Sequence, residues 1–180
     1  MNTLKKLIDQ YILDHPHERA PSKMLGFLIN QSSVFSRKNF LGHFTGSAWI
    51  VSPDRSKVLL THHKKLNKWL QLGGHSDGEK NLLEVAVREA KEESGLKIFK
   101  ILSEYIFDLD IHKVPQFADE PSHYHYDVRF LLQANPEKEL IIANHESHDL
   151  AWVPIHKIFN LNSEPSIKRM ILKTKSLYKS

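Results

Sequence analysis

Apolar side chains recur at helical spacing near the start of the chain. One face carries Leu4, Leu7, Ile8, Tyr11 and Ile12. This i, i+3, i+4 spacing predicts an amphipathic helix, and His15-Pro16 should end it because the residue before a proline disfavours the α region. A second helix is predicted over residues 24–34.

In the middle of the chain the pattern changes to short, strand-like runs. Residues 46–52 and 57–63 are apolar and are joined by Pro-Asp-Arg-Ser, whose turn chemistry predicts a β-hairpin. Residues 68–74 indicate a strand that ends in a glycine pair, and residues 95–112 indicate one or two more strands. Residues 122–134 alternate, which predicts a strand with one polar face. That face carries His123, His125, Asp127 and Arg129.

Helical patterns return after a further predicted strand at residues 148–154. A short helix is expected near residues 155–159, and a C-terminal helix should open at Pro165, since proline is favoured in the first helical turn. The apolar stripe of that helix comprises Ile167, Met170, Ile171 and Leu177. Helices on both sides of a run of strands favour an α/β fold, in which helices cover a sheet.

The length of 180 residues, with 41% hydrophobic and 26% charged side chains, fits one domain. We therefore expect a single domain over residues 1–180. Its predicted parts are an N-terminal helical extension (1–42), a core (43–160) and a C-terminal helix (161–180).

The formal net charge of +4 has a local origin, because residues 168–180 hold five basic and no acidic side chains. No recognised nucleic-acid-binding signature accompanies this charge, so a nucleic-acid partner is disfavoured, and favourable placement at a helix C-terminus is the simpler interpretation. The absence of cysteine excludes disulfides and thiolate chemistry and favours a cytoplasmic location. The first 20 residues do not resemble a signal peptide, and no apolar run reaches the length of about 20 residues that spans a membrane.

The helix predicted over residues 81–94 carries three glutamates beside its apolar face. Glu89, Glu92 and Glu93 fall within one turn, and no lysine follows Glu89 or Glu92 at i+4 to relieve their repulsion. A hard divalent cation would relieve it, because Mg²⁺ and Mn²⁺ take carboxylate oxygens and complete their shells with water and substrate phosphates. The alternative is a solvated acidic face. Gly73-Gly74 favours the cation site, because glycine lets the backbone approach a ligand closely.

The residues from Gly74 to Leu96 resemble the signature of the Nudix hydrolases, G-x5-E-x7-R-E-U-x-E-E-x-G-U, in which U is a bulky apolar residue. The sequence REAKEESGL (88–96) matches every charged and glycine position of its second half. Lys80 stands where the signature has its first glutamate, and Leu72 stands where a proline often precedes the glycine pair. The resemblance extends over residues 46–154.

This resemblance implies an α/β/α sandwich with a mixed β-sheet, here with extra N-terminal and C-terminal helices. It also implies a hydrolase of acid anhydrides that cleaves a pyrophosphate bond in a nucleoside diphosphate linked to another moiety, by water attack at phosphorus. The implied ligands of Mg²⁺ or Mn²⁺ are Glu89, Glu92, Glu93 and the carbonyl oxygen of Gly73. Glu89 or Glu146 would act as the base, and Arg88 would position the carboxylates through an ion pair. A catalytically weak or inactive nucleotide-binding module is the alternative, and Lys80 is its indication.

Polar side chains of the strands suggest how a small nucleotide or another diphosphate is bound. The predicted substrate-binding residues are His75, His125, Asp127 and Arg129. Histidines at i and i+2 on one strand face can share a metal, so a zinc site is a second hypothesis for part of the 12 histidines. Its candidate ligands are His62, His63, His75, His123 and His125, which otherwise line a polar pocket or face water. Trp69, Tyr124 and Tyr126 are candidates to stack on a base, although strand spacing favours a place in the core.

Overall fold

A computed structural model describes residues 2–116, 121–138, 141–142, 145 and 147–177 of the chain. The helices are α1 (Asn2–Asp14), α2 (Ala20–Asn30), α3 (Leu82–Ser94), α4 (Ile158–Leu161) and α5 (Pro165–Ser176). The strands are β1 (Gly42–Val51), β2 (Lys57–His63), β3 (Lys68–Leu70), β4 (Leu72–His75), β5 (Lys100–Ile101), β6 (Asp108–Val114), β7 (His123–Gln133) and β8 (Ser147–Pro154). Within the described ranges no helix is both long enough and apolar enough to cross a membrane.

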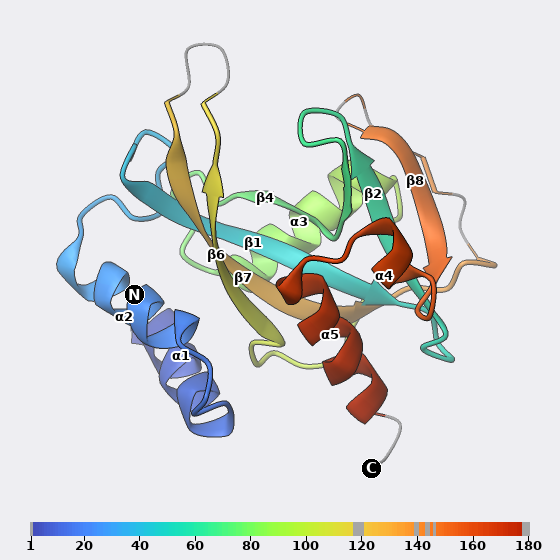
Figure 1. Ribbon diagram of the computed structural model, residues 1–180, viewed down its shortest axis with the longest axis horizontal. Helices are drawn as coiled ribbons and strands as arrows, with labels where there is room; N and C mark the ends of the chain where they lie inside the picture. Colours follow the sequence, from blue (N-terminus) through green and yellow to red (C-terminus); the bar gives the residue numbers. More distant parts are fainter. Residues whose placement is uncertain (1, 117–120, 139–140, 143–144, 146, 178–180) are drawn as a thin grey trace.

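The strands form one mixed sheet with β1 and β7 at its centre (Figure 1). β1 and β7 run parallel in continuous register from Gly42 opposite Tyr124 to Val51 opposite Gln133. The pairs β1–β2, β1–β4 and β6–β7 are antiparallel. The predicted mixed sheet is therefore confirmed.

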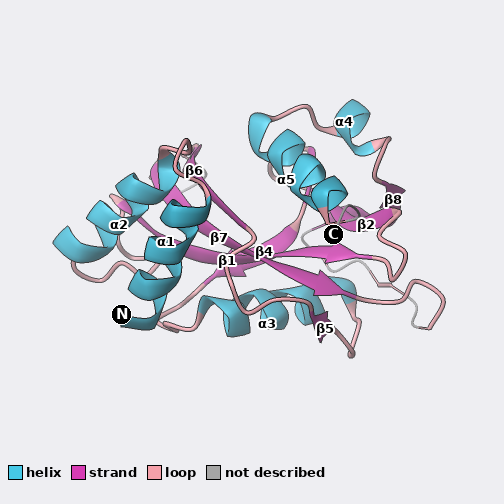
Figure 2. Cartoon of the chain, turned by 90° about the horizontal axis from the view of Figure 1, so that it is seen from below, coloured by secondary structure: helices cyan, strands magenta, loops and turns pink. Residues whose placement is uncertain are grey.

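Helices cover both faces of this sheet, as the sequence predicts. α3 lies on one side and α4 and α5 lie on the other (Figure 2). On the first side, Phe44, Val128 and Phe130 pack in one core cluster with residues of α1, α2 and α3. On the second side, Trp49 and Leu131 pack with residues of α4 and α5, and the indole N–H of Trp49 donates to Thr174 Oγ1 at 2.9 Å. Alternation along β1 and β7 thus supplies two separate cores.

The predicted helices are present with shifted ends. α1 ends at Asp14, directly before His15-Pro16. α2 covers Ala20–Asn30 in place of 24–34, because Pro21 fits the first helical turn and begins the helix earlier. α4 begins at Ile158, later than expected, and Pro165 opens α5 as predicted.

Two strand predictions are corrected by the pairing pattern. β1 begins at Gly42 and not at Gly46, because its parallel pairing with β7 extends over the whole strand. The single strand expected at 68–74 is two strands, since β3 pairs with β2 whereas β4 pairs with β1. This split places the glycine pair beside the central strand.

Candidate active site

α3 has well-defined ends that fix how its side chains face the sheet. The helix ends at Gly95, whose φ of 70° is a left-handed conformation that glycine adopts without steric cost. Before its start, Glu79 Oε1 accepts hydrogen bonds from the backbone N–H groups of Lys80 and Asn81. Of the three glutamates, Glu93 is 8% exposed and lies on the buried side of the helix.

The glycine pair of β4 lies directly against the α3 carboxylates. Glu93 Oε1 accepts a hydrogen bond from the backbone N–H of Gly73 at 3.0 Å. Gly74 is in such close contact with the Glu89 carboxylate that any Cβ at this position would collide with it. A Cβ at Gly73 would collide with Ser47 of β1, so this glycine is required by close strand packing. The glycine pair thus brings two carboxylates to the same strand.

Arg88 links the carboxylates to the end of β4. Its Nη2 donates to Glu89 Oε1 at 2.8 Å and to the backbone carbonyl of His75 at 2.7 Å. Its Nε lies 4.0 Å from Glu92 Oε1, and the Glu92 side chain is 61% exposed. The hydrogen bond to Glu89 raises the pKa of the Arg88 guanidinium, so the cation is retained. The ion pair that the sequence predicts for Arg88 is present.

These residues fit a hard divalent cation. The three glutamates supply carboxylate oxygens from one helix, and Glu92 is open to solvent. Carboxylate oxygens are ligands that Mg²⁺ and Mn²⁺ accept. Two of these carboxylates lie against the glycine pair of β4, Glu93 at Gly73 and Glu89 at Gly74. Glu146, the second candidate base, lies outside the described residues.

Comparison with known proteins agrees with this geometry. A family model described as "NUDIX domain" matches residues 43–174, well over half of the chain. The chain belongs to the Nudix family. The match supports a pyrophosphohydrolase, as the sequence predicts. No curated protein matches the sequence.

Solved structures share the Nudix fold. A C. elegans Ap4A hydrolase binary complex is 15% identical with a TM-score of 0.59, and the match covers 76% of this chain and 97% of that one. The M. smegmatis Nudix hydrolase RenU is 19% identical with a TM-score of 0.55, covering 78% and 88%. A NUDIX-family hydrolase from Clostridium perfringens is 26% identical with a TM-score of 0.52, covering 75% and 97%. These neighbours confirm the predicted fold class.

Four histidines converge beside the Nudix glycine pair. The cluster comprises His43, His75, His123 and His125. One ring nitrogen of each lies within 4.8 Å of those of the others. The parallel register sets His43 opposite His125, and His75 follows the glycine pair on β4.

The expected histidine set is thus partly wrong. His62 stacks on Trp69 with ring centroids 5.2 Å apart, and His63 Nδ1 accepts the N–H of Leu66, so neither joins the cluster. His43, which the sequence prediction missed, takes their place. The available signal was the alternation of polar and apolar residues, which continues back from residue 47 to residue 43.

Burial keeps two of these imidazoles neutral. Burial, followed by the positive charge of Arg37, lowers the pKa of His75 to about 4. Burial and the neighbouring His112 also lower the pKa of His125 far below its ordinary value. A neutral imidazole ring offers a lone pair, and it lacks the charge that would attract a phosphate.

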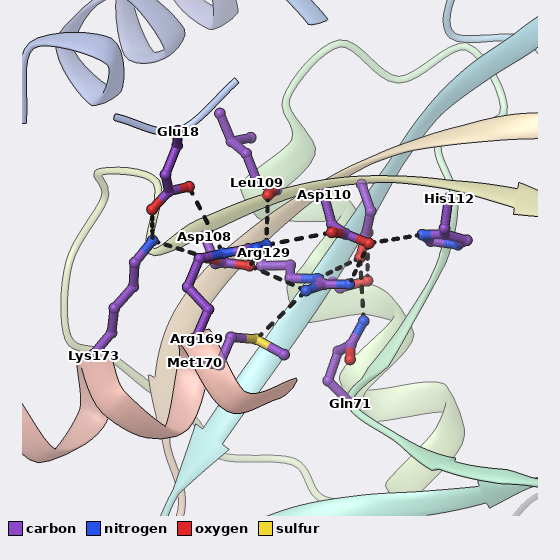
Figure 3. A network of polar contacts seen from close by, with 12 residues as sticks. Glu18, Gln71, Asp108, Leu109, Asp110, His112, Arg129, Arg169, Met170 and Lys173 are labelled. Atoms are coloured by element: carbon purple, nitrogen blue, oxygen red, sulfur yellow. Dashed lines mark hydrogen bonds and ion pairs between the residues drawn. The ribbon is translucent and has the colours of Figure 1, made fainter. Parts of the chain in front are cut away.

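Asp127 and Arg129 belong to a buried polar network. Figure 3 shows this network around Arg129. Arg129 is 3% exposed, and it donates from Nε to Asp127 at 2.7 Å and from Nη1 to Asp108 at 3.1 Å. Asp127 also accepts hydrogen bonds from Thr45 and Ser47. Their contacts show a structural role, and their predicted role in substrate binding stays a prediction.

The C-terminal helix supplies the remaining cations of this network. Arg169 Nε donates to Asp108 at 2.7 Å, and Lys173 Nζ donates to the same carboxylate at 2.8 Å (Figure 3). Lys173 also lies 3.1 Å from Glu18, which follows α1. Two of the five C-terminal basic residues are therefore used inside the fold, which weakens the case for nucleic acid further.

The aromatic candidates for base stacking have separate environments. Tyr126 stacks on Phe27 of α2, with centroids 3.9 Å apart and planes within 6°, so it packs in the core as expected. Tyr124 is exposed on the same strand. Trp69 is occupied by its stack with His62.

A broad groove of about 850 Å³ lies along the other side of α3. It is lined by residues of α1, α3 and the segment 101–105, including Leu7, Leu83 and Tyr105. Arg88 also lines it, but the three glutamates do not, so we do not assign the diphosphate to this groove.

Proposed function

We propose that this Nudix protein hydrolyses a pyrophosphate bond in a nucleoside diphosphate linked to another moiety, with Mg²⁺ or Mn²⁺ as cofactor. The observation that carries the proposal is the contact of Glu89 and Glu93 with the Gly73-Gly74 pair, with Arg88 joined to Glu89 and to His75. This arrangement holds two carboxylates of a helix against one strand, so that both lie near the place where a cation-assisted displacement at phosphorus would occur.

The roles of the residues in this proposal follow the resemblance to the Nudix signature. Glu89, Glu92 and Glu93, with the carbonyl oxygen of Gly73, would hold the cation. When bound, a divalent cation neutralises diphosphate charge and makes a nearby water more acidic. Glu89 or Glu146 would take the proton of the attacking water. Arg88 is a positioning residue, because it holds Glu89 against the end of β4.

The diphosphate substrate would lie over the polar end of the sheet, next to His75 and His125. Structural neighbours such as the Ap4A hydrolase of C. elegans motivate dinucleoside polyphosphates as one class to test. Nucleotide sugars, ADP-ribose and nucleoside triphosphates complete the panel.

A nucleotide-binding module with weak or no turnover is the second candidate. Lys80 favours it, because a cation stands where the family signature has a glutamate. The backbone N–H of Lys80 is bound by Glu79, so an acidic side chain is nevertheless held at this turn. The same activity assay separates the two candidates.

The test is release of phosphate or monophosphate from that panel with Mg²⁺ or Mn²⁺. We expect turnover of at least one substrate class, with loss of about 10³-fold in Glu92→Gln and Glu93→Gln, since a charge-stabilising cation supplies several kcal/mol to the transition state. Glu84→Gln is the matched control, because Glu84 lies on α3 and bonds Asn81 away from the glycine pair.

The outcome that decides against catalysis is equally concrete. If Glu92→Gln and Glu93→Gln turn over substrate as fast as the native chain, these carboxylates take no part in the mechanism. Nucleotide binding without turnover of any class would favour the binding module.

A further inference from the structure

The four-histidine cluster has the composition of a transition-metal site. It draws His43 from the start of β1, His75 from the end of β4, and His123 and His125 from the start of β7. Imidazole nitrogen suits Zn²⁺ and its neighbours, whereas Mg²⁺ prefers oxygen. We propose that His43, His75, His123 and His125 bind one zinc-class divalent ion at a site separate from the glutamates of α3.

The spacing of the ring nitrogens supports this site. Nε2 of His123 lies 3.1 Å from Nε2 of His125, and the whole set lies within 4.8 Å. With Zn–N bonds of about 2.0–2.1 Å, ligand nitrogens of a tetrahedral ion are about 3.3 Å apart. Small side-chain rotations therefore bring all four nitrogens to bonding distance.

Hydrogen bonds on the far side of two rings orient the cluster. Nδ1 of His123 lies 2.8 Å from the carbonyl oxygen of Pro121, and Nδ1 of His43 lies 3.4 Å from that of Asn39. A carbonyl only accepts, so each Nδ1 carries the proton and each Nε2 presents its lone pair. Such backbone contacts are the usual outer partners of metal-binding histidines.

His75 supplies an independent observation. Its Nε2 is buried and makes no hydrogen bond to any part of the chain that the structure describes. A buried polar atom without a partner is uncommon and needs an explanation, which a bound ion provides. His75 and His125 are partly buried, whereas His43 and His123 are buried.

Four protein ligands would make the site closed and structural, because a catalytic zinc keeps a position for water or substrate. An ion here would tie together the ends of three strands beside the glycine pair. It would also fix His75, whose carbonyl receives Arg88. The inference does not depend on the proposed hydrolysis.

Metal content of the tag-free full chain tests the proposal directly. After treatment with a chelator, addition of Zn²⁺ and removal of the excess, mass spectrometry of the metal should find one zinc per chain. His43→Gln and His123→Gln should lose it. His62→Gln is the matched control, since His62 is a strand histidine that stacks on Trp69 outside the cluster. Glu92→Gln should keep the zinc even where turnover is lost.

Thermal unfolding provides a second readout that does not need turnover. Zinc at a hundredfold excess over its Kd should raise the Tm of the native chain by about 5–10 °C, and should leave the two cluster variants unchanged. Should these variants fail to fold, Co²⁺ added to the native chain must give the visible absorption of a tetrahedral ion.

Three results would overturn the proposal. These are a native chain that retains no zinc, zinc binding that survives both cluster substitutions, and a Tm that rises with inorganic phosphate but not with zinc. The last result would reassign the cluster to the phosphate groups of a substrate.

Discussion

Two groups of carboxylates in this molecule have opposite surroundings. Asp108 is fully buried and is surrounded by cations from other elements, Arg129 of β7 and Arg169 of α5 among them. Glu92 of α3 is mostly exposed and is 4.0 Å from its nearest described cation, Arg88. The Asp108 carboxylate is held inside the fold, whereas Glu92 faces outward beside Glu89 and Glu93, which contact the glycine pair.

The two groups also differ in how their charges are compensated. Burial alone would raise the pKa of Asp108, but hydrogen bonds from Arg169 and the charges of Arg129 and Lys173 outweigh it and hold this pKa below its usual value. Its charge is thus compensated from within the chain. The glutamates of α3 crowd beside Arg88 within one turn, an arrangement that gains from an added cation.

Asp108→Asn should give the largest change in stability. It removes the negative charge that Arg129, Arg169 and Lys173 share, and leaves these buried or half-buried cations less compensated. Breaking a buried ion pair from one side costs about 3–5 kcal/mol in the free energy of unfolding. Urea unfolding at neutral pH measures it.

Asp9→Asn is the matched control, since Asp9 pairs with Lys5 on the surface of α1. An exposed pair of this kind contributes about 0–1 kcal/mol. A loss in Asp108→Asn no larger than in Asp9→Asn would show that the buried network does not stabilise the fold.

Arg88→Lys should have the next largest effect. This effect should be on turnover and not on stability. Lysine keeps the charge but cannot donate to Glu89 and to the His75 carbonyl from one planar group. Loss of such an outer contact reduces metal affinity or activity by about 10–100-fold. The reduction in kcat should grow smaller at saturating Mn²⁺ if Arg88 acts by positioning ligands.

Lys91→Arg is the control for a charge-preserving substitution on the same helix, because Lys91 is an exposed residue of α3. If the native chain and Arg88→Lys have the same kcat at a limiting metal concentration, Arg88 does not position the metal ligands.

Local patterns predicted most of the fold and the α3 carboxylates. The apolar arc of α3, the glycine after it and the glutamate spacing are all contained in one short segment, so no distant contact is needed to interpret them. The polar face of β7 was predicted for the same reason.

Non-local pairing explains the misses. His43 joins the cluster only because β1 pairs in parallel with β7, a register that single-strand periodicity does not contain. Arg169 reaches Asp108 across 61 residues of sequence, which depends on how α5 docks on the sheet. For this reason the C-terminal cations were expected at a helix end and not in a buried network.

The pH dependence of the unfolding free energy gives the smallest of these effects. It distinguishes the carboxylates of the buried network from those of exposed ion pairs. Burial would raise the pKa of Asp110, but the hydrogen bond with His112 and the charges of Arg129 and Arg169 lower it to about 2 from 3.8. A depressed pKa means that the folded state binds the proton less well than the unfolded state. Its contribution is therefore present above about pH 4 and disappears as the pH falls toward 2.

The native chain should exceed Asp110→Asn in unfolding free energy near pH 5, and this excess should shrink by about 2 kcal/mol by pH 2. Urea unfolding of both proteins across that pH range measures the difference in unfolding free energy. The other carboxylates titrate in both proteins, so their contributions cancel in this difference. The same comparison with Asp9→Asn should give a nearly constant difference, because Asp9 and Lys5 are both solvent-exposed. A constant difference for Asp110→Asn as well would mean that Asp110, like Asp9, makes no compensated contact in the folded chain.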